Sequence, residues 1–160
     1  MKAFVSWFAA LAAATTFVHA EPPANYVQAV EAARAERVAV LTKPDNWLTL
    51  IGLHFLPPGE STIGSAKNNA VVLAAGPAHL GKVTLAADGK VTLTIAAGVD
   101  AKIDGEAVRA GELKLGEGRV KPTYVTTGTV TFYAVDRGGK KALRVKDSAA
   151  KTRTGFVGLD

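Results

Sequence analysis

The stretch that decides the fold runs from residue 44 to residue 85 and reads PDNWLTLIGLHFLPPGESTIGSAKNNAVVLAAGPAHLGKVTL. Its first part, residues 47–56, is an apolar run that ends at Pro57-Pro58-Gly59. A short apolar run that stops at Pro and Gly is typical of a buried strand rather than a helix. Two more short strands are expected at 61–63 and 71–73, between turn residues. The stretch therefore predicts the first strands of a β-rich domain.

Beyond this stretch, apolar and polar residues alternate with the period of two that strands require. Asp88-Gly89 separates two such segments and is typical of a tight hairpin turn, and Asp104-Gly105 and Gly138-Gly139 predict two further turns. The expected strands are 83–85, 91–95, 113–115, 129–135 and 142–145. Many short strands joined by glycine-bearing turns indicate a mainly β protein, an antiparallel sandwich or barrel.

Residues 21–43 predict a single N-terminal helix between Pro22-Pro23 and Pro44. Apolar side chains recur there at helical spacing while charged residues fill the other face, as expected of an amphipathic helix. The apolar set is Tyr26, Val27, Val30, Ala33, Val38 and Leu41. We expect this helix to pack on the β-domain that follows it.

The first twenty residues, MKAFVSWFAALAAATTFVHA, have the pattern of a secretory signal peptide. Lys2 precedes an uncharged apolar segment, and small residues stand at Val18 and Ala20, where a signal peptidase reads the chain. The alternative is a membrane anchor, but the apolar run is short for crossing roughly 30 Å of hydrocarbon. We expect cleavage after Ala20, export to the periplasm or the outside of the cell, and no stable membrane span afterwards.

Length and composition are those of one globular domain, expected over residues 44–160. The net charge of +5 permits contact with anionic surfaces without requiring it. The absence of cysteine excludes disulfides, thiolate metal sites and a cysteine nucleophile. A nucleic-acid partner is not expected for an exported protein.

Several motifs resemble the N-terminal half of an uncharacterised family, domain of unknown function 1684. They are Asn46-Trp47-Leu48, Ile51-Gly52-Leu53, Ile63-Gly64-Ser65, Ala78-His79-Leu80-Gly81, Leu143-Arg144-Val145-Lys146-Asp147 and Phe156-Val157-Gly158. Members of that family continue well past the last of these motifs. The resemblance therefore implies a chain that lacks the family's C-terminal half, and one alternative is a shortened member without independent activity.

A second set of residues falls in the order seen in forkhead-associated (FHA) domains, β-sandwiches whose loops bind phosphothreonine. The set is Ile63-Gly64-Ser65, Asn69 to Leu73, His79 and Ile103-Asp104-Gly105. Ser65, Gly76 and Asp104 stand where that family has the phosphate-binding Arg, Ser and Asn. The resemblance thus implies an FHA-like antiparallel β-sandwich, but not phosphopeptide binding.

The most charged segment, residues 136–153, predicts an anion-binding face, since it holds seven cationic and two anionic side chains. On a strand, Arg144 and Lys146 would share one face, opposite Leu143 and Val145. We predict that Arg137, Arg144 and Asp147 bind an anionic small molecule, polymer or protein. The alternative is a solvated sheet face on which Arg144 pairs with Asp147, since outer strands commonly carry lysine and arginine.

No motif predicts a catalytic residue, a metal site or a cofactor. The two histidines after the leader, His54 and His79, lack the spacing of paired metal ligands. We expect His54 to be a hydrogen-bonded core residue, and His79 to tie a loop to its neighbour and to be a candidate binding residue. The favoured function is a non-catalytic binding or envelope-associated module. The alternative is a hydrolase-like enzyme with polar groups near His79 and Ser65.

Overall fold

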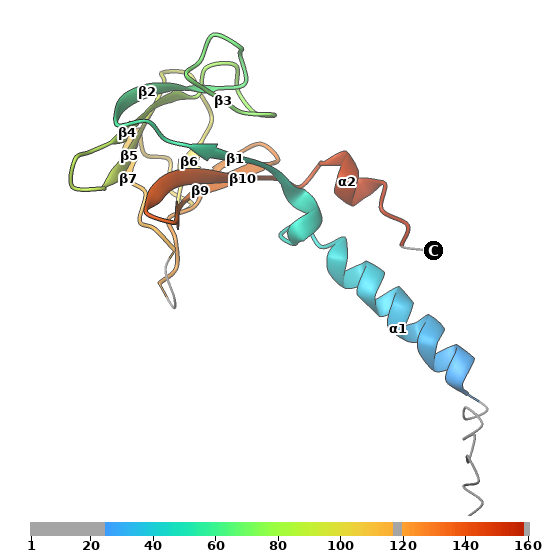
Figure 1. The fold of residues 1–160 in the computed structure, drawn as a ribbon. Coiled ribbons are helices and arrows are strands. Elements are labelled where there is room, and N and C mark those ends of the chain that lie inside the picture. The colour runs from blue at the N-terminus through green and yellow to red at the C-terminus, as the bar shows by residue number, and fades with distance from the viewer. Residues whose placement is uncertain (1–24, 117–119, 159–160) are drawn as a thin grey trace, which may run out of the picture.

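The body of the molecule is a β-sandwich, in which two five-stranded sheets face each other (Figure 1). The computed structural model describes residues 25–116 and 120–158, so the predicted signal peptide lies outside the described residues. The first sheet has the order β1 (Leu50–Phe55), β10 (Lys140–Asp147), β9 (Val130–Arg137), β8 (Val125–Thr127) and β6 (Lys102–Ile103). The second has the order β3 (Val71–Val72), β2 (Gly59–Gly64), β4 (Gly81–Leu85), β5 (Val91–Ile95) and β7 (Ala110–Glu112). The pairing is antiparallel as predicted, apart from the short parallel pair β2–β3.

The core lies between the two sheets and takes side chains from both. Phe132 and Leu143 of the first sheet and Ile63 and Leu93 of the second are fully buried in one cluster. Burying each such side chain stabilises the fold by about 1.5–3 kcal/mol. The alternation of residues 129–135 places Val130, Phe132 and Ala134 on one side of β9, and all three are buried.

The start of the first predicted strand is wrong. Residues Trp47–Thr49 form a 3-10 turn, η1, because the side-chain oxygen of Asn46 accepts a hydrogen bond from the Trp47 amide at 2.6 Å. Strand β1 begins only at Leu50 and lies at a sheet edge, where Leu53 is 43% and Phe55 53% exposed. The apolar run that predicted a buried strand therefore leaves one apolar side open to solvent.

Short elements account for the other differences between prediction and structure. Strand β8 and a one-turn helix, α2 (Lys151–Thr154), were not expected. The strand predicted at 113–115 is wrong, since the strand in this region is β7, which ends at Glu112. Elements of three or four residues are too short to show a period. The Gly138-Gly139 turn is confirmed, since it joins β9 to β10 with Arg137 paired to Lys140.

The predicted N-terminal helix is present as α1 (Tyr26–Leu41), but its predicted packing is wrong. No residue of α1 is buried, and the helix leads away from the sandwich (Figure 1). Alanine is its commonest residue and offers little apolar area to bury. Within the described residues, its C-terminal end is held by Arg153, which donates to the Thr42 carbonyl at 2.8 Å.

Among the residues that the structure describes, no helix combines the length and the apolar character that a membrane crossing requires.

Candidate functional site

The candidate site lies on the side of the first sheet that faces away from the core, here called the outer face. Directly paired residues of antiparallel strands project from the same side of a sheet. Arg144 pairs with Leu53 on β1 and with Tyr133 on β9, which places these three side chains in one row across the outer face. Leu50, Lys146 and Thr131 form the next row. The prediction that Arg144 and Lys146 share a face is confirmed.

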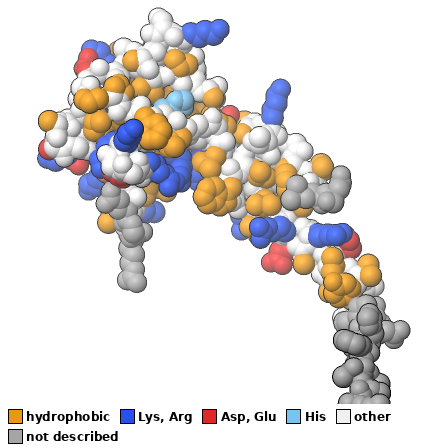
Figure 2. All heavy atoms as spheres, in the orientation of Figure 1, with side chains coloured by type: hydrophobic (Ala, Val, Ile, Leu, Met, Phe, Trp, Pro, Cys, Tyr) orange, Lys and Arg blue, Asp and Glu red, His pale blue; other side chains and the backbone are white. Residues whose placement is uncertain are grey.

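Apolar and basic side chains adjoin each other on the outer face. Where β1 and β10 lie in Figure 1, the space-filling view shows hydrophobic and Lys or Arg side chains side by side (Figure 2). The exposed apolar side chains of this region include Trp47, Leu53 and Phe55. A surface of this composition can contact the apolar and the anionic part of one ligand.

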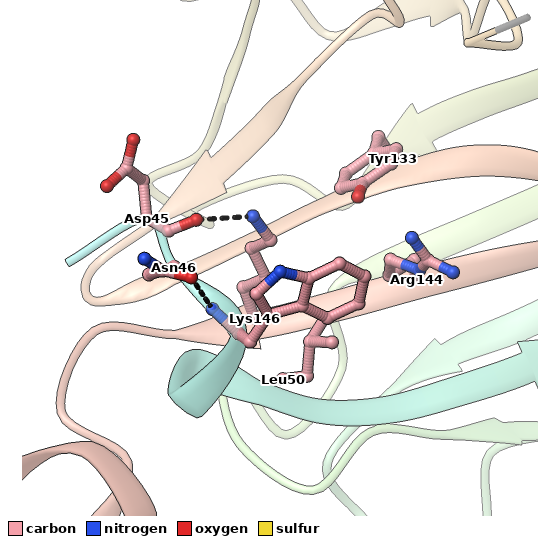
Figure 3. A pocket seen from close by; sticks show the side chains of 7 residues that line it. Asp45, Asn46, Leu50, Tyr133, Arg144 and Lys146 are labelled. Atoms are coloured by element: carbon pink, nitrogen blue, oxygen red, sulfur yellow. Dashed lines mark hydrogen bonds between the residues drawn. The ribbon is translucent and has the colours of Figure 1, made fainter. Parts of the chain in front are cut away.

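A hollow of about 240 Å³, the Arg144 hollow, opens on this face (Figure 3). It is lined by Asp45, Asn46, Trp47, Leu50, Tyr133, Arg144 and Lys146. Arg144 and Lys146 come from β10 and Tyr133 from β9, while Trp47 comes from η1 and is 68% exposed. Segments about a hundred residues apart in the sequence thus meet at one site.

The two cations of the hollow differ in their partners. The Lys146 ammonium donates to the Asp45 carbonyl oxygen at 2.7 Å. Arg144 takes part in none of the four ion pairs and none of the side-chain hydrogen bonds of the described residues. A guanidinium carries five N–H donors, so those of the half-buried Arg144 remain free for an incoming anion.

Trp47 is held in place by the contacts of its neighbours. The Thr49 side chain is fully buried and donates its hydroxyl to the Asn46 carbonyl. Thr152 of α2 donates to the Leu48 carbonyl at 2.7 Å, and Lys146 fixes Asp45 on the other side. The indole therefore sits on a restrained turn, which lowers the entropy lost when a ligand packs against it.

A second hollow of about 420 Å³, the threonine hollow, continues the first one along the outer face. The two share Asp45 and Lys146. Hydroxyl-bearing side chains dominate its lining, namely Tyr124, Thr126, Thr129, Thr131 and Ser148. The rings of Tyr124 and Tyr133 meet edge to face with centroids 5.2 Å apart.

The predicted binding residues do not all converge. Arg137 projects from the outer face but lies at the hairpin end of β9, roughly 13 Å along the strand from Tyr133. Asp147 pairs with Val130 on the core side, and its carboxylate accepts the Ala149 amide at 2.9 Å. The alternative pairing of Arg144 with Asp147 is therefore not formed. Of the predicted set, only Arg144 lines a hollow on the outer face.

Sequence reasoning missed Trp47 and Tyr133 as site residues. The alternation in residues 129–135 does place Tyr133 opposite the buried Phe132, and that signal could have marked it as outward-facing. The position of Trp47 could not have been found in this way, because it depends on the η1 turn and on the pairing of β1 with β10.

His79 lies at an exposed position where two loops of the second sheet meet. Its Nδ1 is 3.4 Å from the Asn69 side-chain oxygen, and the buried Asn69 donates its amide to the carbonyls of Ala66 and Ala78, each at 2.8 Å. The predicted loop tie is thus present, with Asn69 as its centre. The Ser65 hydroxyl donates to the Gly76 carbonyl at 2.8 Å, so Ser65 and His79 are not paired as a nucleophile and base.

His54 lies at the edge of the first sheet and differs from its prediction. It is half-buried, and its buried Nε2 has no hydrogen-bond partner among the described residues. The ring lies against the backbone of Gly52, and burial lowers the pKa of this imidazole. Within residues 25–116 and 120–158, no three carboxylate or imidazole groups gather as metal ligands.

Comparison with models of known protein families and with curated proteins finds no match for this chain. The likeness to domain of unknown function 1684 and to FHA domains therefore stays a prediction.

Proposed function

We propose that the protein is an exported, non-catalytic binding module that holds an anionic ligand on the outer face of its first sheet. The observation that carries this proposal is the Arg144 guanidinium, which is half-buried in an open hollow, lacks a partner among the described residues and lies beside the exposed Trp47. Export is proposed from the pattern of residues 1–20.

The energetics of an unpaired cation support an anionic ligand. Arg144 has lost part of its hydration without gaining a carboxylate in return, and such a group gains most from a ligand that supplies the missing acceptor. A guanidinium and a carboxylate form two parallel hydrogen bonds, and each charge-assisted bond contributes about 1.5–3 kcal/mol. The Lys146 ammonium has two further donors besides the one directed to Asp45.

The arrangement of polar groups favours binding over hydrolysis. An active site requires a nucleophile or general base within hydrogen-bond reach of its partner. Ser65 and His79 are each bonded elsewhere, and the lining of the Arg144 hollow includes neither histidine nor serine. The alternative of a shortened chain without activity has less support, because both sheets share one well-buried core.

Citrate, a small tricarboxylate, is a suitable first probe. In a Trp7→Phe variant Trp47 is the only tryptophan, so its fluorescence reports on the Arg144 hollow directly. We expect a saturable change on citrate addition at low ionic strength. Arg144→Ala should weaken the binding at least about tenfold, which corresponds to about 1.4 kcal/mol.

Arg37→Ala is the matched control, because it removes the same side chain and charge from an exposed position on α1. This variant should bind citrate like the parent protein. Equal weakening by both substitutions would attribute the binding to net charge and overturn the proposed site. An unchanged affinity in Arg144→Ala would overturn it as well.

A further inference from the structure

We propose that the anionic ligand is an acidic polysaccharide, with a carboxylated sugar ring in the Arg144 hollow and the neighbouring ring in the threonine hollow. This inference rests on the proposed function and names its ligand class. The observation behind it is the continuity of two chemically different hollows that share Asp45 and Lys146.

The size and order of the hollows suit a polymer rather than a single small anion. They measure about 240 and 420 Å³ and lie next to each other along one sheet face. The unpaired cation lines only the first of them. A ligand that fills both must place an anionic group in the first hollow and neutral hydroxyl groups in the second.

Trp47 provides a platform for a sugar ring. It is 68% exposed although the turn that carries it is fixed by Thr49 and Thr152. One face of a pyranose consists of C–H groups, which pack well against an indole, and the hydroxyls at its rim stay free to hydrogen-bond. A restrained aromatic platform beside a guanidinium matches a uronic acid, whose carboxylate extends from the ring.

The lining of the threonine hollow matches the next sugar. A hydroxyl is both donor and acceptor, so Thr126 and Thr131 can bond to sugar hydroxyls in either direction. A polyphosphate or nucleic acid would require cations along its whole path. Among the described residues, Lys146 is the one cation that lines this hollow, and Asp45 lines it as well.

The position on a sheet face argues against an extended acidic peptide. Peptides that add to a sheet bond to the free backbone groups of an edge strand. Strands β10 and β9 are paired on both sides, and β8 lies between β9 and β6. The free edge of β1 lies at one side of the Arg144 hollow, where Leu50 lines it, but the rest of the two hollows offers side chains of paired strands. Side-chain hydroxyls and aromatic rings suit a saccharide better than an extended peptide.

Binding of the full-length protein to three uronate polymers, polygalacturonate, alginate and hyaluronate, tests this inference. We expect at least one of them to bind by isothermal titration. For polygalacturonate, full methyl esterification should weaken binding at least tenfold if it is the polymer that binds. Trp47→Ala should lower the affinity at least tenfold for the polymer that binds. The isosteric Thr131→Val should lower the affinity for that polymer severalfold and leave the affinity for citrate unchanged. Urea midpoints of the variants serve as the control for folding.

Each outcome decides between the two proposals. Citrate binding that depends on Arg144, without tight binding of any uronate polymer, would overturn the saccharide inference and leave the proposed function standing. Polyglutamate that binds as tightly as the best uronate polymer, with the same dependence on Arg144, would point to an acidic protein partner instead. Binding of neither citrate nor uronates would overturn both.

Discussion

His54, at the edge of the first sheet, is a side chain whose protonation affects the stability of the fold. Its ring lies against Gly52, its Nε2 is buried without a partner among the described residues, and burial lowers its pKa below the ordinary value of about 6.5. A lowered pKa means that the unfolded chain binds a proton at a higher pH than the folded chain does. Folding stability contributed by neutral His54 is therefore complete above pH 6.5 and decreases as the pH falls below that value.

We predict that His54→Leu removes part of the acid sensitivity of the fold. Between pH 7.5 and pH 5.5 the parent protein should lose more free energy of unfolding than the variant does, because the variant has no imidazole to protonate. Urea unfolding of both proteins at each pH measures the difference, and carboxylate effects cancel in the comparison. Equal losses would show that the folded protein accommodates the charged ring.

Two positions require glycine because neighbouring backbone segments approach them closely. A side chain on Gly64 would overlap the carbonyl oxygen of Ala78, and one on Gly81 would overlap that of Thr94. The sequence marks such positions only as turn residues, whereas the structure shows that the lack of a side chain lets neighbouring backbone segments meet.

For the helices and strands, the number of residues over which apolar and polar side chains alternate determined whether the element could be predicted. Strands β9 and β10, eight residues each, alternate long enough to reveal their inward side, but β8 and α2 do not. A periodic pattern also cannot show whether an apolar face has a partner, so the packing of α1 was predicted wrongly. The site was predictable only to the extent that Arg144 and Lys146 lie on one strand, since Trp47 and Tyr133 join them through strand order.

We predict that α1 unfolds without affecting the sandwich. Ala33→Pro, in the middle of the helix, should cost the helix about 3 kcal/mol and reduce the far-ultraviolet helical signal. The urea midpoint followed by Trp47 fluorescence in the Trp7→Phe background should stay the same, because no residue of α1 is buried. A clear fall in that midpoint would mean that the helix packs on the sandwich in solution.

At the scale of the whole molecule, the two sheets have different roles. The second sheet closes the core and carries the loops tied by Asn69, while the first sheet contributes its inner side to the core and its outer face to the candidate site. The C-terminal α2 supports η1 through Thr152, so the far end of the chain helps to position Trp47. The candidate site thus combines η1 with strands β1, β9 and β10 rather than resting on one hairpin.

The most direct test of the proposed site is a citrate titration of the full chain followed by two-dimensional proton–nitrogen correlation NMR, which maps the residues that contact the ligand. We expect saturable shift changes at the Trp47 indole N–H and at the amides of Tyr133, Arg144 and Lys146, which line the Arg144 hollow. Shift changes centred on the loops around His79, or on the hairpin end at Arg137, would contradict the proposed site and place ligand binding elsewhere.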